Sequence, residues 1–499
     1  MIQIRLGFII VVSHLSELNL LYNTSNFTSR LLHQEILQTL SIHHHTNQQS
    51  SIRQSIRDDY AKKTLKSLND FYKNRIVNYR KYKNLISVSI DSSEEVEKGQ
   101  VLASSVGFTT KLICKLEDFR SLESQWNELY TKCERSSIFS SWDWMFTWWE
   151  VYKDQFQRQL YILCIYQYDE LIGIIPFQIE KVYPQSLIQG KTLRFIGSGD
   201  ARDDRILTQY QDFIALPNFE SEIVEYVSNY LIQHKKDWDF ADFEYLLENS
   251  LVLQCFTNHK NNKVARQKID CGVRFTISGM DDFDSYINKM GGRWRKMFAK
   301  KNRLLSRDGE VTIEETDTLE SIKPAFVQLT KMHCSRWKDR VDHCVFDSSR
   351  FCEFHKKVIR RLLPQKKSAI KTIKLNGKAL ATYYIFMDKG QVHYYQSGFY
   401  SKYANKYSPL FILVCKEIGR AIKNKQVFDF MYADSVNSYK KNQYAADAEK
   451  MYRLRWASRP SRLFVFRCAK TVQIKLLGLY CHFKKIIKIN FKNVFIKNK

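Results

Sequence analysis

A run of apolar segments separated by tight turns, between residues 370 and 441, constrains the fold of this chain more than any other stretch. Residues 370–375 predict a strand, and Asn376-Gly377 suits a two-residue hairpin because both positions tolerate a positive φ. Residues 379–387 and 391–397 predict two further strands. The first of these is apolar almost without alternation, so we expect it to be covered on both faces.

The stretch after this meander predicts a helix and a returning strand. Residues 398–407 are expected to form a loop, Ser408 to cap a helix, and Pro409 to fill its first turn. Residues 427–432 predict a short buried strand that carries one acid, Asp429. This strand can return beside the third one, which gives an α/β (α+β) fold with a mixed sheet.

Four short motifs accompany these elements: Arg-Trp-Arg-Lys from Arg293, His-x2-Arg-Trp from His333, Gly-Phe-Tyr-x3-Ala-x3-Ser-Pro from Gly398 and Phe-Asp-Phe-x8-Tyr-Lys from Phe428. Their order and spacing resemble the GNAT superfamily of acyltransferases, and within it the CelD-type acetyltransferases of cellulose and exopolysaccharide biosynthesis. The resemblance covers roughly residues 278–456. It implies two GNAT-like units with centrally splayed sheets.

Length and charge bound the class of protein. A chain of 499 residues predicts two or three domains. The net charge of +26 predicts an anionic partner, such as a nucleotide-like ligand, a nucleic acid or membrane headgroups. The 11 cysteines lack the dense spacing of a disulfide scaffold, which indicates free thiols in a reducing compartment, most simply the cytoplasm.

An internal repeat organises the chain. Residues 159–167 and 171–179 predict a hairpin that matches the one at 369–387, and similar Phe-x-Ser-Ser or Phe-Ser-Ser wording precedes each. We therefore expect an N-terminal appendage, helical or partly disordered, at 1–105, GNAT-like units at 106–268 and 269–460, and a tail at 461–499. The second unit is expected to carry the acyl-transfer site.

Both ends of the chain are read as extensions of this core. The tract around His43–His45 is more typical of a solvated linker than of a metal site, and no apolar run reaches the ~20 residues of a spanning helix. The tail mixes many cations with apolar residues, which suits the surface of an anionic membrane on its inner face. Nucleic acid, including tRNA, and packing on the core stay open for this tail.

Aromatic and basic clusters have both functional and structural interpretations. Tryptophans crowd residues 139–149, either as a stacking platform for a ligand or, as we favour, as a buried helix wedged against the sheet. The loop 195–204 holds Gly197, Gly199, Asp203 and Asp204 and is expected to line the cleft between the units.

Residues 291–307 predict a basic amphipathic helix. No acid interrupts its cations, so an anion is expected to compensate their repulsion. Residues 322–337 predict the next helix, ending in His333-Cys334-Ser335-Arg336-Trp337. The spacing of these and the following Cys and His residues fits no usual zinc pattern, so no metal is expected.

The resemblance to GNAT enzymes implies a place for an acyl donor. In that arrangement two neighbouring strands diverge and admit the pantetheine arm of an acyl-CoA, here acetyl-CoA or another acyl-CoA, while its pyrophosphate lies at the next helix N-terminus. The residues that would hold the donor are Gln396, Gly398, Ser408, Pro409 and Leu410. Residues 404–409 contain no glycine, unlike the superfamily's pyrophosphate loop, so another activated donor stays open.

The same resemblance suggests roles in direct attack of an amine or hydroxyl on a thioester. Asp429, with a pKa raised by burial, would be the base, and Tyr439 or Tyr395 the acid. The substrate-binding residues would be Arg295, Arg336, Trp337 and Lys440. Two alternatives stay open: a Fem-type transferase that uses aminoacyl-tRNA, and a non-catalytic scaffold at a membrane or nucleic acid.

Overall fold

The computed structural model describes residues 107–181, 190–200, 204–257, 265–337 and 344–457. All of them belong to the second of two compact units, residues 103–499. The expectations for the appendage at 1–105 and the tail at 461–499 lie outside the described residues. In the described part of the chain, no helix has both the length and the apolar character needed to cross a membrane.

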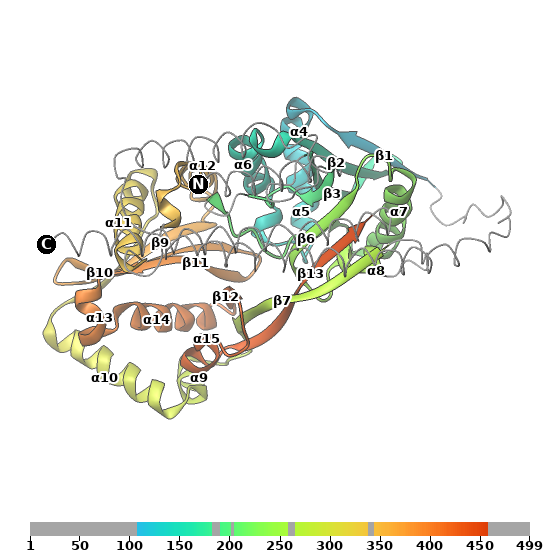
Figure 1. Cartoon of the computed structure of the whole chain (residues 1–499). Coiled ribbons are helices and arrows are strands. Elements are labelled where there is room, and N and C mark those ends of the chain that lie inside the picture. Colours follow the sequence, from blue (N-terminus) through green and yellow to red (C-terminus); the bar gives the residue numbers. More distant parts are fainter. Residues whose placement is uncertain (1–106, 182–189, 201–203, 258–264, 338–343, 458–499) are drawn as a thin grey trace, which may run out of the picture. The chain divides into compact units, whose positions relative to one another are not determined.

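One mixed sheet of 13 strands runs through both halves of the described chain, in the order β1-β2-β3-β4-β6-β13-β7-β12-β11-β10-β9-β8, with β5 paired to β3 (Figure 1). The strands of the first half are β1 (Phe108–Ile113), β2 (Arg158–Gln167), β3 (Glu170–Glu180), β4 (Thr192–Phe195), β5 (Ile214–Ala215) and β6 (Phe240–Leu247). The others are β7 (Ala265–Ile277), β8 (Val311–Glu315), β9 (Ser368–Leu375), β10 (Lys378–Asp388), β11 (Gln391–Phe399), β12 (Val427–Ala433) and β13 (Asp447–Ala457).

Helices alternate with the strands in both halves. The first half contains α4 (Leu116–Ser121), α5 (Glu123–Lys132), α6 (Trp142–Tyr152), α7 (Glu220–Gln233) and α8 (Leu251–Thr257). The second contains α9 (Phe283–Lys289), α10 (Gly292–Asp308), α11 (Leu319–Trp337), the short η6 (Val345–Asp347), α12 (Ser349–Leu362), α13 (Ser401–Tyr407), α14 (Pro409–Lys423) and α15 (Tyr439–Tyr444).

The predicted hairpin of the second half is confirmed. β9 and β10 pair antiparallel, and Asn376 and Gly377 between them have φ values of 50° and 73°. The expected loop at 398–407 is wrong, because β11 continues to Phe399 and residues 401–407 form α13. Small and polar residues there imitate a loop, but α13 packs on α10 and α14, and this tertiary contact overrides weak helix propensity.

Helices cover both faces of the sheet. One core, shared by the two halves, lies under α4, α5, α6, α11 and α12. On the opposite face α7 and α8 cover the first half, and α9, α10 and α14 cover the second. Figure 1 shows α11 and α12 on one side of β9–β11 and α13 and α14 on the other.

The tryptophan-rich segment forms α6, whose residues are buried from Trp142 to Trp149. Ser141 caps this helix by accepting a hydrogen bond from the Trp144 amide at 3.3 Å. The helix packs against α12 of the second half. The interpretation as a buried aromatic helix therefore holds, and its rings fill the shared core.

Two strands join the halves. β13, near the C-terminal end of the described chain, pairs antiparallel with β6 of the first half and with β7. β7 crosses the expected boundary between residues 268 and 269 and pairs with β12 on its other edge. The halves thus share one hydrogen-bonded sheet.

Candidate active site

The neighbouring strands β11 and β12 diverge in the middle of the second half. They pair in parallel over three residue pairs only, from Gln391↔Val427 to His393↔Asp429. Beyond that point β11 runs on to Phe399 and β12 to Ala433 without pairing to each other. The predicted splay is therefore present, and its apex lies at His393 and Asp429.

Bulges in both strands explain the divergence. On β11, Tyr395 is an extra residue, because Tyr394 pairs with Ile385 and Gln396 with the adjacent Tyr384 of β10. On β12, the register with β7 shifts between Asp429 and Tyr432. A bulge bends its strand and increases the local twist, so two bulges just beyond the apex drive the strands apart.

Asp429 lies at the apex and is fully buried. Its Oδ2 accepts hydrogen bonds from Arg274 Nε at 3.1 Å and His393 Nδ1 at 3.0 Å. Its Oδ1 accepts from the Tyr210 hydroxyl at 3.2 Å and the Met431 amide at 2.7 Å. Four donors from four places in the chain therefore meet on one carboxylate.

These donors reverse the expected pKa shift of Asp429. Burial raises the pKa of the carboxyl, but the Arg274 guanidinium, His393 and the Met431 amide outweigh it and lower the pKa to about 2. The expected upward shift of this pKa is therefore wrong. At neutral pH Asp429 is an ionised hydrogen-bond acceptor that positions its neighbours.

Lys440 lies beside the divergent part of β12. Its Nζ donates to the carbonyl oxygens of Phe430 at 2.7 Å and Tyr432 at 3.0 Å. Burial lowers the pKa of the ammonium to about 8, although Asp429 and Asp434 oppose the shift. These two carbonyls take up two of the three N–H groups of the ammonium.

The two candidate acids lie in different settings. Tyr395 is buried in the shared core, with its ring 5.9 Å from Trp144 and 5.2 Å from Phe386. Burial raises the pKa of its hydroxyl, which keeps the group protonated and makes it a weaker proton donor than an ordinary tyrosine. Tyr439 begins α15, and its side chain lies outside the described residues.

The β11 residues that were expected to bind the acyl donor, Gln396 and Gly398, lie against α11. A Cβ atom at Gly398 would lie 2.6 Å from the His333 backbone nitrogen and 2.6 Å from Met332 Cβ, so this glycine is explained by close packing of α11. The Gln396 side chain hydrogen-bonds His333, and the Arg336 guanidinium lies 5.0 Å from the centre of the Phe399 ring. Trp337 ends α11, with its side chain outside the described residues.

The N-terminus of α14 has no side-chain cap. Ser408 occupies the cap position with φ 49°, but its hydroxyl donates back to Ala404 O at 3.3 Å and caps nothing. The expected side-chain cap is therefore wrong, because the left-handed conformation turns the hydroxyl toward α13. Pro409 has no N–H, so the amides of Leu410 and Phe411 are the first donors of the helix.

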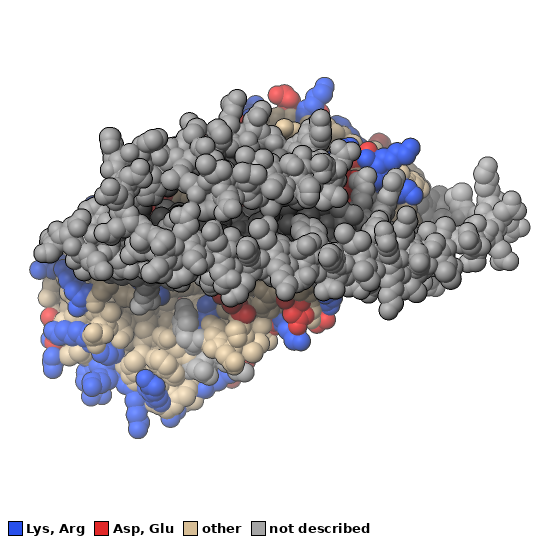
Figure 2. Space-filling model, in the orientation of Figure 1, with Lys and Arg blue, Asp and Glu red and all other residues tan. Residues whose placement is uncertain are grey.

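The predicted basic helix is α10, and it packs beside this N-terminus. Trp294 and Phe298 lie 6.0 Å and 6.4 Å from Phe411, measured between ring centres. Figure 2 shows Lys and Arg side chains gathered where α10 lies in Figure 1. The exposed cations are Arg293, Arg295, Lys296, Lys300, Arg303 and Arg307. Arg295 also hydrogen-bonds Asn288 at 3.3 Å.

The first half has a matching pair of strands, β4 and β6, but side chains bridge them. They pair in parallel only at Thr192↔Phe240 and Leu193↔Ala241. At the next position, Arg194 binds Asp242 at 3.1 Å and also Glu180 at 2.9 Å, all buried. Buried charges need such pairing, and here the pairing links the two strands where they begin to separate.

Sequence reasoning missed three residues of the site: Tyr210, Arg274 and His393. Tyr210 lies 219 residues from Asp429 and Arg274 lies 155 residues away, so no local pattern connects them. Asp204, which was expected to line the cleft between the units, accepts a hydrogen bond from Ser348 of the second half at 2.6 Å. Asp203 lies outside the described residues.

One segment of the chain matches a known protein family. Residues 292–441 match a family described as "Acetyltransferase (GNAT) domain". No curated protein matches this chain in sequence. The matched segment contains β8 to β12, the helices between them and the apex at His393 and Asp429.

Solved structures show weaker likenesses. A crystal structure of FemX is 10% identical and has a TM-score of 0.48, covering 72% of this chain and 100% of that one. L-PGS from Bacillus licheniformis is 12% identical, with a TM-score of 0.41 and coverage of 74% and 99%. A tandem GNAT protein from the clavulanic acid biosynthesis pathway is 7% identical, with a TM-score of 0.35 and coverage of 71% and 99%.

The family match and the observed strand order agree on the second half of the chain. The matched segment ends at residue 441, directly after Lys440, and so includes the divergent part of β12 and the side chain that binds its carbonyls. Residues 292–441 are therefore similar to a GNAT acetyltransferase domain.

Proposed function

We propose that the second half of the chain transfers an acyl group from acyl-CoA, such as acetyl-CoA, to an amine or hydroxyl acceptor. The observation that carries this proposal is the separation of β11 from β12 beyond His393 and Asp429. Their facing edges can bind an extended ligand between them, as a missing strand would. The bridged strands β4 and β6 favour the second half over the first.

The anionic end of the donor is assigned to the N-terminus of α14. The amides of Leu410 and Phe411 point out of an uncapped helix, where the helix dipole favours negative charge. The exposed cations of α10 flank this position and add a field that attracts the same charge. These features fit a phosphate-bearing donor although residues 404–409, just before and at the start of α14, contain no glycine.

The transfer itself is a direct attack on the thioester. The acceptor oxygen or nitrogen bonds to the carbonyl carbon, the C–S bond breaks, the acceptor proton passes to a base, and the departing thiolate takes up a proton. Lys440 is assigned to the developing oxyanion through its third N–H. Tyr439 or Tyr395 would protonate the thiolate, and Arg295, Arg336 and Trp337 would contact the acceptor or the donor.

Asp429 acts in this proposal as a positioning residue. Its carboxylate holds His393 and Arg274 at the apex and fixes the Met431 amide in the bulge. An Asp–His pair of this kind also sets which imidazole nitrogen carries the proton. His393 therefore replaces Asp429 as the candidate base.

The acceptor class is proposed from the sequence resemblance. The motifs shared with CelD-type acetyltransferases favour a hydroxyl or amine of a polysaccharide or another cell-envelope component. A surface that gathers cations on α10 suits an acceptor or donor that carries negative charge (Figure 2).

A charge change at Ser408 tests the donor site. Ser408→Asp places a carboxylate where the donor phosphate is proposed to lie, and Ser408→Asn is its neutral counterpart of the same shape. Both residues tolerate the left-handed conformation seen at Ser408. We expect acetyl-CoA to bind the Asp variant at least about tenfold more weakly than the Asn variant, measured by isothermal titration calorimetry.

Further assays distinguish the acyl-CoA-dependent transferase from the Fem-type transferase and the scaffold. Turnover of acetyl-CoA that is lost in Lys440→Met supports the proposal, whereas unchanged turnover would remove Lys440 from the site. Equal affinity of the Ser408 variants for acetyl-CoA would overturn the donor site. Binding of aminoacyl-tRNA without acetyl-CoA would favour the Fem-type alternative, and binding of anionic vesicles alone would favour a scaffold.

A further inference from the structure

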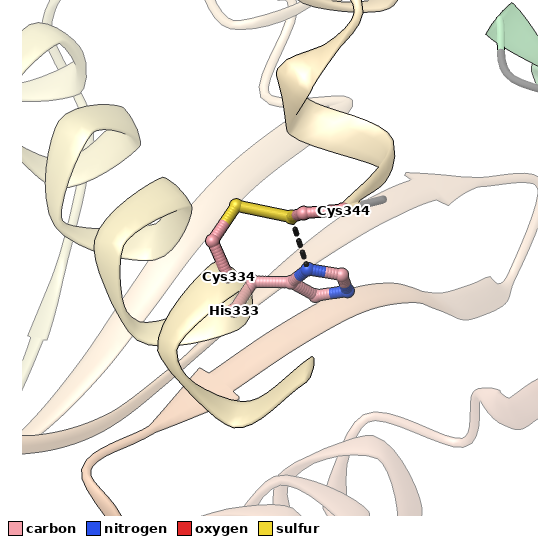
Figure 3. A group of neighbouring side chains, drawn as sticks. All are labelled: His333, Cys334 and Cys344. Carbon is pink, nitrogen blue, oxygen red and sulfur yellow. Dashed lines mark hydrogen bonds between the residues drawn. A yellow bond between two sulfur atoms is a disulfide. The ribbon is translucent and has the colours of Figure 1, made fainter. Parts of the chain in front are cut away.

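A histidine and two cysteines meet at the end of α11, away from the apex of the acyl site. The ligand atoms of His333, Cys334 and Cys344 all lie within 4.8 Å of one another. His333 and Cys334 are neighbours on α11, and Cys344 directly precedes η6 (Figure 3). The sequence predicts free thiols here, but the structure joins Cys334 and Cys344 in a disulfide, with their Cα atoms 5.4 Å apart.

The imidazole faces the sulfur atoms. His333 Nδ1 lies 3.3 Å from Cys344 Sγ, and the ring packs edge-on against Phe346 at 5.0 Å. The His333 side chain is 8% exposed, so its position is set by packing. Figure 3 shows the ring turned toward the disulfide.

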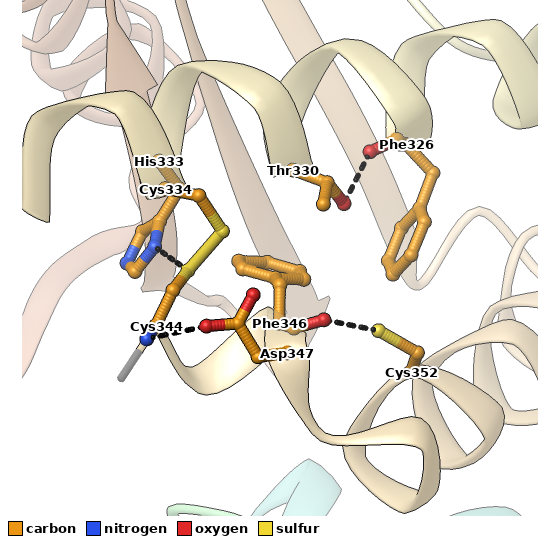
Figure 4. The surroundings of a disulfide bond; sticks show 8 residues. All are labelled: Phe326, Thr330, His333, Cys334, Cys344, Phe346, Asp347 and Cys352. Carbon is orange, nitrogen blue, oxygen red and sulfur yellow. Dashed lines mark hydrogen bonds between the residues drawn. A yellow bond between two sulfur atoms is a disulfide. The ribbon is translucent and has the colours of Figure 1, made fainter. Parts of the chain in front are cut away.

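The surrounding contacts hold this arrangement in place. The Cys344 amide donates to Asp347 Oδ2 at 2.9 Å (Figure 4). On the other side, Gln396 of β11 hydrogen-bonds His333. A ligating histidine is commonly oriented by a hydrogen bond of this kind from its other side.

Two sulfurs and one imidazole nitrogen are a metal-binding set once the disulfide is open. In a tetrahedral zinc site, bonds of about 2.3 Å to sulfur and 2.0–2.1 Å to nitrogen put those atoms about 3.6 Å apart. The present separation of 3.3 Å between nitrogen and sulfur is close to that value. The sulfurs must move apart from bonding distance, which rotation of the two cysteine side chains supplies.

We propose that reduced Cys334 and Cys344, together with His333, bind a soft divalent cation such as Zn²⁺, and that formation of the disulfide abolishes the site. A dithiol reductant supplies two electrons and two protons, becomes a disulfide itself and leaves two thiols. Zn²⁺ then displaces the two thiol protons and forms two Zn–S bonds and one Zn–N bond. Water occupies the fourth position.

The site lies on the back of the divergent strand. The His333 backbone closely approaches Gly398, and Arg336 lies over Phe399, so the end of α11 contacts β11 where it has left β12. The metal and the acyl donor would therefore sit on opposite sides of the same strand segment. The proposal does not depend on the acyl-transfer activity, and its test uses no acyl donor.

Cobalt titration tests the site in the full chain. Co²⁺ bound by thiolates gives a charge-transfer band in the near ultraviolet, and Zn²⁺ displaces it. After reduction with a phosphine and removal of the excess, we expect one equivalent of Co²⁺ to give this band, and the oxidised protein to give none. The His43–His45 tract can bind Co²⁺ through nitrogen only and does not produce the band.

Variants identify the ligands. Cys344→Ser and His333→Gln should each weaken Co²⁺ binding at least about tenfold. Cys352→Ser is the matched control, because this nearby cysteine donates to Phe346 O at 3.2 Å and lies outside the cluster (Figure 4). A reduced protein without the thiolate band, or an unchanged band in both ligand variants, would overturn the proposal. The comparison of oxidised with reduced wild type decides the matter if a variant fails to fold.

Discussion

At the scale of single residues, the hydrogen bonds of Asp429 set the charge state of this carboxyl group. A buried carboxylate is costly unless donors surround it, and four donors do so here. The same donors lower its pKa, which makes the carboxylate a weaker base than that of an ordinary aspartate. The residue and its donors lie at the point where the two strands separate.

Removing this charge should destabilise the fold. Asp429→Asn leaves the largely buried Arg274 without its main partner, and we expect the free energy of unfolding to fall by about 3 kcal/mol, measured by urea denaturation. Glu449→Gln is the control, because Glu449 binds the same guanidinium at 3.5 Å but is 44% exposed. A loss below 1 kcal/mol is expected there. Equal losses in the two variants would contradict the central role of Asp429.

The acid stability of the protein should depend on the same carboxylate. Its folded pKa of about 2 lies below the ordinary value of 3.8, so its contribution is present above pH 4 and is lost as pH falls toward 2. The difference corresponds to roughly 2 kcal/mol. Urea midpoints measured from pH 7 to pH 2 should fall less steeply in Asp429→Asn, and parallel curves for both proteins would refute this assignment.

At the scale of elements, α11 packs very closely against β11 at Gly398. Gly398 lets the helix backbone approach the divergent strand, and there is no space for a Cβ atom. The position of α11 thus depends on one residue type at one place in β11. The resemblance to GNAT enzymes had assigned this glycine to donor binding.

Gly398→Ala should therefore cost stability. The added methyl group must displace α11, and we expect a loss of about 1–3 kcal/mol in the free energy of unfolding. Gly292→Ala is the matched control, since this glycine begins α10 and has nothing within 4 Å of the Cβ position. That change should be neutral or stabilising by about 0.5 kcal/mol. Thermal denaturation of both variants checks the contrast, and a stable Gly398→Ala protein would refute the packing argument.

At the scale of the whole described unit, β13 makes one sheet of the two halves. Met451 illustrates the connection, because it is buried and opposes Leu247 of β6 and Gly272 of β7. Because β13 is paired on both edges, its loss would leave unpaired strand edges in both halves. The halves should therefore unfold together.

Met451→Ala tests this coupling. We expect a loss of about 2–5 kcal/mol and a shared shift of the unfolding midpoint in β2–β3 and in β9–β10. Hydrogen exchange read by mass spectrometry across a urea series reports both hairpins in one experiment. A midpoint that shifts in only one hairpin would show that the halves unfold independently.

Local patterns predicted the elements that local physics specifies. The Asn376-Gly377 turn, the apolar strand after it and the proline at the start of α14 follow from backbone preference and burial, and the structure confirms them. α13 was missed, since its residues have weak helix propensity and depend on packing. β6, β7 and β13 were missed because their pairing partners lie far away in the chain.

The sequence by itself determined the repeated α/β plan, the basic helix and the order of strands that lets β12 return beside β11. Only the tertiary structure decided what each site residue does. Tyr210 and Arg274 reach Asp429 from 219 and 155 residues away, and His393 joins them across the parallel pair. A pKa depends on the charges and donors within a few ångströms, and those neighbours exist only after the sheet has closed around them.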